Sequence, residues 1–291
     1  MGLKEISLCV FAAVALQAIS CKAGKKVDAQ QEQTVADTLQ TDSIAYRATP
    51  DSLLECHIVA DYPSGNDSLS QAVAIYVSNE LGRVYLPLVS NGGQTKSFSL
   101  FSGDKTKGKA VVDYYGKCMS KYLFREFNDM RSEGVENLPG MSCDVAVRKV
   151  YENDRYLTYT TSTYTYLGGA HGSSVSYSVN IVKPSGKVLE ETVDTLKVGQ
   201  LQPILRKGIM AYLHENGDAE ATEKNLDNYL FLENGVVPMP SQAPCLTDKG
   251  VCFVYQQYEI GPYALGMVTF TVPYKEILPY LKPEVRTLVV N

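Results

Sequence analysis

The stretch Tyr164-Thr165-Tyr166-Leu167-Gly168-Gly169-Ala170-His171-Gly172 joins two segments with the character of β-strands. Residues 155–166 before it consist mostly of Tyr, Thr, Ser and Leu, which suit a pleated sheet. In residues 173–181 after it, apolar side chains alternate with Ser and Asn, the period of a strand buried on one face and hydrated on the other. The glycines allow positive φ or a close backbone approach. We therefore predict two strands joined by this turn, with His171 either a functional residue at its tip or an ordinary turn residue.

Helical and strand patterns extend outward from this turn in both directions. Apolar residues at helical spacing predict helices, and alternating or β-branched runs predict strands. The helices are expected near 68–81, 111–131 and 200–215, and the strands near 56–60, 142–151, 156–167, 173–182 and 267–272. A hairpin is expected over 243–258, with its turn at Asp248-Lys249-Gly250.

The break after Ser132-Glu133-Gly134 is the best candidate for a domain boundary. We predict an α+β protein with two domains, residues 51–134 and 135–291, each with helices packed on an antiparallel or mixed sheet. The chain of 291 residues is long enough for two such cores.

The N-terminus has the features of a bacterial lipoprotein signal. A positive residue precedes an apolar run, residues 6–19, that is too short to span a bilayer. Ala18-Ile19-Ser20-Cys21 resembles a lipobox, so residues 1–20 are predicted to be a signal peptide and Cys21 to carry lipid. The alternative is simple secretion with cleavage near Ala23.

Residues 21–50 are predicted to be a flexible tether, because their polar composition cannot bury enough apolar surface to order itself. Lys22 after the cysteine is typical of sorting to the outer membrane. We therefore expect a lipid-anchored envelope protein, facing the periplasm or the cell surface, that contacts the membrane through its anchor only.

Composition excludes several classes of function. The net charge of −5 gives no basic surface for nucleic acid. The sequence contains no dinucleotide fingerprint, P-loop, G-x-S-x-G elbow or metal-ligand spacing, and we predict neither a metal nor another cofactor.

Tyrosines and one carboxylate define a candidate ligand site. Glu259 lies in Tyr258-Glu259-Ile260-Gly261-Pro262-Tyr263, where Gly-Pro predicts a turn. If this turn meets the glycine-rich turn, Glu259 and His171 share a site rimmed by Tyr164, Tyr166, Tyr258 and Tyr263, which suit protein interfaces and sugar faces. The alternative is that both turns are structural and Glu259 accepts backbone N–H bonds.

The cysteines allow one specific pairing. Without Cys9 in the signal and Cys21 at the anchor, five remain, so at least one stays unpaired. If Asp248-Lys249 forms a two-residue turn, Cys245 lies directly opposite Cys252, within disulfide range. We predict this bridge; a shifted register or five reduced thiols are the alternatives.

The combination of Tyr164 to Gly172, the Lys183-to-Lys187 turn, and Tyr258-Glu259-Ile260-Gly261-Pro262-Tyr263-Ala264 resembles a bacterial envelope family. It is similar to the extracytoplasmic domain pair of lysozyme-sensing anti-sigma factors, which also accompanies some peptidoglycan deacetylases as a non-catalytic part. The resemblance covers about residues 136–285 and, more weakly, 53–134. We recognise no sigma-factor-binding segment and no deacetylase domain in this sequence. The resemblance therefore implies a fold and an envelope location, with ligand binding as an analogy only.

These features favour an envelope-anchored binding module for a lysozyme-like protein or a cell-wall glycan, without catalysis of its own. The alternatives are a hydrolase or deacetylase acting on envelope glycan through His171 and Glu259, and a purely structural protein. A hydrolase is expected to have a concave cleft with converging polar groups, and a binding module a flatter surface rich in tyrosine.

Overall fold

The computed structural model describes residues 38–90, 99–135 and 137–290. The predicted signal peptide and Cys21 lie outside these residues. Within them, no helix combines the length and the apolar character needed to cross a membrane.

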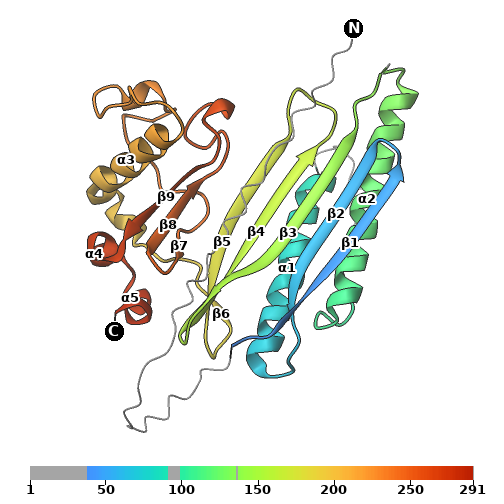
Figure 1. Ribbon diagram of the computed structural model, residues 1–291, viewed down its shortest axis with the longest axis horizontal. Helices are drawn as coiled ribbons and strands as arrows, with labels where there is room; N and C mark the ends of the chain where they lie inside the picture. Colours follow the sequence, from blue (N-terminus) through green and yellow to red (C-terminus); the bar gives the residue numbers. More distant parts are fainter. Residues whose placement is uncertain (1–37, 91–98, 136, 291) are drawn as a thin grey trace, which may run out of the picture. The chain divides into compact units, whose positions relative to one another are not determined.

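Six strands form one mixed sheet in the order β1-β2-β3-β4-β5-β6. Their bounds are Thr41–Asp51 (β1), Leu54–Pro63 (β2), Met141–Glu152 (β3), Tyr156–Tyr166 (β4), Ser173–Val182 (β5) and Lys187–Val188 (β6). Neighbouring strands are antiparallel except β2 and β3, which are parallel. Parallel neighbours need a long crossover, and two helices between them in the chain supply it: α1 (Ser68–Ser90) and α2 (Gly108–Ser132) (Figure 1).

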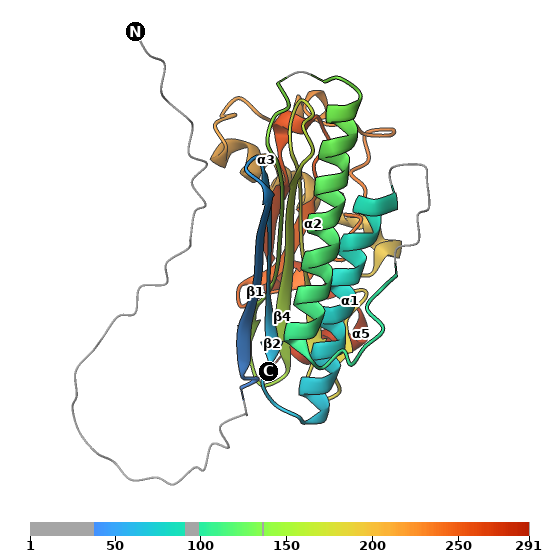
Figure 2. The same ribbon diagram turned by 90° about the vertical axis from the view of Figure 1, so that its right-hand side faces the viewer.

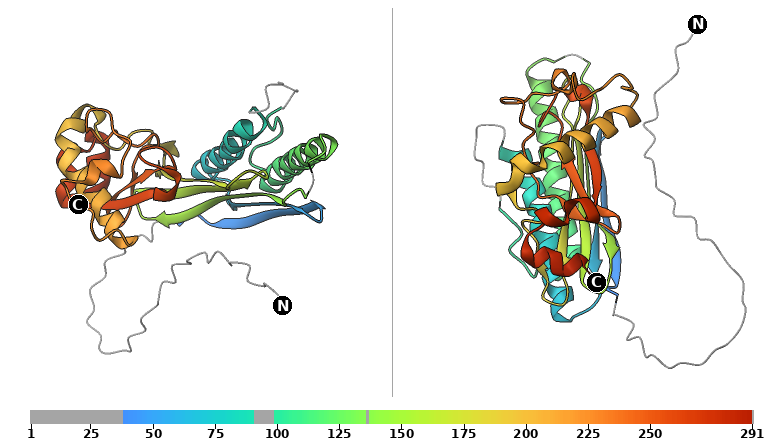
Figure 3. Two further views of the ribbon diagram at one scale, coloured as in Figure 1. Left: turned by 90° about the horizontal axis from the view of Figure 1, so that it is seen from above. Right: turned by 90° about the vertical axis from the view of Figure 1, so that its left-hand side faces the viewer.

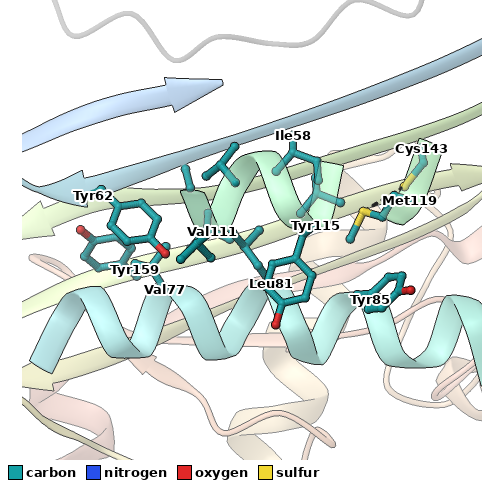
Figure 4. Packing of buried hydrophobic residues seen from close by; sticks show 14 of the residues in the cluster. Ile58, Tyr62, Val77, Leu81, Tyr85, Val111, Tyr115, Met119, Cys143 and Tyr159 are labelled. Carbon is teal, nitrogen blue, oxygen red and sulfur yellow. Dashed lines mark hydrogen bonds between the residues drawn. The ribbon is translucent and has the colours of Figure 1, made fainter. Parts of the chain in front are cut away.

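Helices α1 and α2 lie side by side on the same face of this sheet (Figures 2 and 3). Every second residue of β2 points into the core that they cover, from Leu54 through Ile58 to Tyr62. Figure 4 shows how tyrosines and aliphatic side chains fill the space between helix and sheet. The core is rich in tyrosine, and the hydroxyl groups of Tyr62, Tyr76 and Ser78 are buried there.

Three further strands form a second, antiparallel sheet in the order β7-β8-β9. The strands are Cys245–Leu246 (β7), Gly250–Tyr255 (β8) and Val268–Pro273 (β9). The helices in this part of the chain are Val198–Glu215 (α3), Tyr274–Ile277 (α4) and Pro283–Val289 (α5). Four short 3-10 turns accompany them: Thr195–Lys197 (η1), Leu226–Asn228 (η2), Tyr263–Leu265 (η3) and Leu278–Tyr280 (η4). Helix α3 packs closely on β9, because Gly208 leaves room for the Phe270 ring, where an added Cβ would lie only 2.2 Å from it.

Side-chain amides connect the second sheet to the first. Asn180 on β5 donates through Nδ2 to the Leu246 carbonyl oxygen (3.0 Å) and accepts through Oδ1 from the Leu246 N–H (2.7 Å). Gln256, just after β8, bonds in the same two-sided way to Ser176, at 3.1 and 2.8 Å. Each side-chain amide makes the pair of N–H···O=C bonds that the backbone of a neighbouring strand would make. These bonds hold β7 and the end of β8 along the edge of β5.

The predicted α+β class, with helices on an antiparallel or mixed sheet, is confirmed. Two details differ. Residues 41–50, assigned from the sequence to the tether, form most of β1, an edge strand hydrogen-bonded to β2. The predicted boundary at 134/135 falls between β2 and β3, within the six-stranded sheet, whereas the second core gathers mainly residues after Leu189.

The strand pattern of β5 was correct in period, but one residue of its polar face is not hydrated. Asn180 is only 1% exposed because β7 covers it. The predicted register of Cys245 opposite Cys252 is confirmed. The structure records both as free thiols, so the disulfide stays a prediction. A second pair, Cys56 opposite Cys143 on the parallel strands β2 and β3, was not predicted.

Candidate functional site

The two turns that the sequence singled out meet in the structure. His171 lies between β4 and β5, and its Nδ1 lies 3.0 Å from the carbonyl oxygen of Gly172. Its Nε2 lies 3.2 Å from the hydroxyl of Tyr258, which follows β8. A ring that donates from Nδ1 to the carbonyl can accept from the tyrosine hydroxyl at Nε2. Both ring nitrogens of His171 are therefore engaged.

Tyr263 completes this cluster. Its ring stacks on the imidazole of His171, with centroids 3.8 Å apart and planes inclined by 24°. Its hydroxyl donates to the same Gly172 carbonyl oxygen, at 3.0 Å. The imidazole thus has a fixed position and orientation although the residue is exposed.

Tyr258 is unusual in its backbone. It has a φ of 67°, in the left-handed region that non-glycine residues seldom adopt, and it is 57% exposed. Such a conformation costs on the order of 1 kcal/mol, and strained backbone of this kind clusters at functional sites. Here it lets the tyrosine hydroxyl reach His171.

Glu259 does not pair with His171. Its Oε1 accepts from the N–H of Ser241 (2.5 Å) and its Oε2 from the N–H of Gln256 (2.6 Å). The described residues show no hydrogen bond between these two side chains, and the carboxylate of Glu259 accepts backbone N–H bonds, as the structural alternative expected. The carboxylate satisfies one backbone donor of its own turn, at Gln256, and one at Ser241, in the segment before β7.

Two other predicted tyrosines lie on β4. The ring of Tyr164 packs over Gly172, where an added Cβ would lie 2.4 Å from it, which explains the glycine. Tyr166 pairs in register with Ser142 and is half-buried. Strand alternation places both tyrosines on the face opposite to α1 and α2.

A half-open cavity of about 550 Å³ lies on the helix side of β4 and β5, with His171 at one end. Its wall on α1 includes Arg83 and Val84. Its floor contains both hydroxyl-bearing and apolar side chains. The remaining lining residues are Pro87, Thr163, Thr165, Leu167, Gly169, Ser173, Val175 and Tyr177.

Arg83 is fixed at the far end of this cavity by a buried carboxylate. Its guanidinium lies 4.2 Å from the centroid of the Tyr177 ring and 3.2 Å from Glu80. Glu80 also accepts from the hydroxyl of Tyr177 and from Thr161 Oγ1 (3.1 Å). The positive charge of Arg83 is therefore neutralised within the protein.

Sequence reasoning missed the α1 wall and the hydroxyl-bearing floor. A signal was present: Glu80 and Arg83 stand three residues apart beside the apolar stripe of α1, a spacing that lets side chains on a helix interact. That this pair lies over β5 depends on tertiary structure.

The other two histidines have neighbours of their own. His214 Nε2 bonds to the Ala221 carbonyl oxygen at 2.7 Å, and His57 on β2 lies 3.7 Å from Asp144. Burial, together with nearby arginines, lowers the pKa of His57 from its ordinary value. In the part of the chain that the structure describes, no group of three His, Cys, Asp or Glu side chains could hold a metal ion.

One family model matches part of the chain. Residues 194–275 match the family described as "Protein of unknown function (DUF3298)". This range contains Tyr258, Glu259 and Tyr263 but not His171. No curated protein matches the sequence.

Two solved structures have a similar fold. A member of the DUF3298 family from Bacteroides fragilis is 19% identical, with a TM-score of 0.60, and the match covers 87% of this chain and 98% of that one. A DUF3298 family protein from Pseudomonas aeruginosa is 17% identical, with a TM-score of 0.54, covering 86% and 97%. The chain is thus similar to DUF3298 proteins in sequence over residues 194–275 and in fold over most of its length.

Proposed function

We propose that the protein is an envelope-anchored module that binds a cell-wall glycan, without catalysis, in the cavity that ends at His171. The observation that carries this proposal is the cavity itself. Its volume of about 550 Å³ lies within the range of small-ligand sites, roughly 300–1,000 Å³. Protein interfaces are larger and flatter, so the cavity favours a glycan over a lysozyme-like protein.

The chemistry of the lining suits a sugar. A pyranose ring has hydroxyl groups at its edge and C–H groups on its faces. Thr163, Thr165 and Ser173 offer hydroxyl groups that donate and accept, while Val84 and Val175 offer apolar contact. The charge of Arg83 is balanced by Glu80, which fits an uncharged ligand.

Three observations support binding without catalysis. Hydrolysis of a glycosidic bond generally uses two carboxyl groups, and the described residues that line this cavity contain none. Both nitrogens of His171 already have partners. Glu259 is committed to backbone donors. The cavity is concave, as expected for a hydrolase, but the groups that would perform the hydrolysis are not arranged in it.

The envelope location rests on the lipobox at Cys21 and on the resemblance to the anti-sigma factor and deacetylase domain pair. A lipid-anchored module with a glycan site would hold its membrane close to the cell wall.

Calorimetric titration with a trisaccharide of β-1,4-linked N-acetylglucosamine tests this function. We expect Thr163→Trp, which fills the cavity, and His171→Ala to weaken binding at least about tenfold. His57→Ala, on the opposite face of the sheet, is the matched control and should leave binding unchanged.

Three outcomes would overturn the proposal. One is equal affinity in all these variants. Another is turnover of the trisaccharide. The third is binding of purified lysozyme in place of both the trisaccharide and cell-wall fragments.

A further inference from the structure

We infer that the ligand is a linear glycan chain that runs beyond the His171 cavity, across Arg83 and Tyr177, into a second cavity. This inference rests on the proposed function and specifies the form of the ligand. It starts from one observation: Arg83 and Tyr177 line both cavities, so the two share a boundary.

The second cavity has a volume of about 410 Å³. It lies between α1, β5 and the segment 241–244 that precedes β7. Its polar lining includes Glu80, Ser178 and Glu190, and its apolar lining includes Val179 and Ala243. It thus repeats the mixture of hydroxyl and apolar groups found in the first cavity.

The two cavities follow one strand. Ser173 lines the first and Asn180 the second, and seven residues of an extended strand measure about 23 Å. A single sugar ring cannot span this distance, whereas a chain of several rings can.

Arg83 and Tyr177 form the joint between the cavities. Glu80 is buried and holds both, through the ion pair with Arg83 and the bond from the Tyr177 hydroxyl. The guanidinium, whose Cζ lies over the ring 4.2 Å from its centroid, has N–H groups that can donate to sugar oxygens. The joint is therefore a fixed contact midway along the proposed path.

Neighbouring structure favours a glycan over an extended peptide. A peptide commonly adds to a free sheet edge through its backbone. On β5 that edge is occupied, because Gln257 accepts from the Ser174 N–H (3.0 Å) and Gln256 pairs with Ser176. Both cavities therefore present side chains, and Arg83 is already balanced by Glu80.

Oligomers of β-1,4-linked N-acetylglucosamine of increasing length test the inference by calorimetric titration. We expect the hexasaccharide to bind at least about tenfold more tightly than the trisaccharide. Ala243→Trp and Glu190→Trp, two independent changes in the second cavity, should remove this gain and leave trisaccharide binding unchanged. Thr163→Trp should weaken both oligomers. Glu190 is exposed, so its replacement tests the path without disturbing the core.

The outcomes separate the two proposals. If both oligomers bind equally and binding still depends on Thr163 and His171, the extended path is wrong and the proposed function stands. If neither oligomer binds, both are wrong. If a cell-wall peptide binds in place of the oligomers, the glycan path is overturned.

Discussion

Asn180 is predicted to hold the second sheet against the first. It is 1% exposed and bonds to the Leu246 carbonyl oxygen at 3.0 Å, the Leu246 N–H at 2.7 Å and Thr158 Oγ1 at 2.9 Å. In Asn180→Ala the N–H and C=O of Leu246 lose their partners in a buried place. Each unpaired buried group costs about 1–3 kcal/mol.

The free energy of unfolding should therefore fall by about 3 kcal/mol, from two unpaired groups at the lower half of that range. For a body of this size, each kcal/mol corresponds to about 2–4 °C in the melting temperature. A decrease of about 10 °C is expected on this scale.

Ser178→Ala is the matched control for Asn180→Ala. Ser178 lies on the same strand and face, and its hydroxyl bonds to that of Thr160, at 2.7 Å, and also contacts the thiol of Cys245. Its loss should cost about 1 kcal/mol or less. Urea denaturation followed by circular dichroism measures both variants, and hydrogen exchange at the Leu246 amide reports the local effect. Equal stability of the two variants, or full protection of Leu246 in Asn180→Ala, would refute the reasoning.

Three further predictions concern a buried carboxylate, the paired thiols and the anchor. Glu152, whose side chain is 7% exposed, bonds to two lysines at 2.8 Å each. These bonds outweigh burial and hold the pKa of Glu152 below its ordinary value. The contribution of Glu152 to the stability of the folded state is therefore present above the pKa that the group has in the unfolded state. It is lost as pH falls through the lower pKa of the folded state. Glu152→Gln should lower the free energy of unfolding by about 3 kcal/mol at neutral pH. A difference in stability from wild type that persists in acid would contradict this. Peptide mapping of the exported protein without reductant should link Cys245 to Cys252, and free thiols at both positions refute the bridge. Cys21→Ser should release the protein from the membrane or leave it unprocessed, and an intact mass matching an unlipidated chain cut elsewhere refutes lipidation.

Local patterns in the sequence predicted most of the elements. The alternation in β5 and the helical stripes of α1, α2 and α3 arise from residues close in sequence, so their periods are readable. β1 was missed because it is an edge strand, mostly exposed, with Ile44 and Tyr46 its only large apolar residues. The parallel pairing of β2 and β3 was unpredictable for another reason: it joins segments separated by two helices.

At the candidate site, too, local sequence features were readable, whereas contacts between distant segments were not. The unusual composition of each turn made it a candidate, but their meeting was only one of the alternatives that the sequence left open. The side-chain contacts of Glu259 were not predicted, because one of its two backbone donors belongs to Ser241, 18 residues earlier in the chain. The cavity was not predicted because Arg83 and Thr163 lie far apart in sequence and face each other only in the folded sheet.

The most direct test of the glycan site is a map of backbone amide shifts by NMR during titration with the trisaccharide. We expect saturable shifts concentrated at Thr163, Thr165, Ser173 and His171, with those of His57 unchanged. An absence of shifts at these cavity residues, or saturable shifts confined to another face, would contradict the proposed binding site.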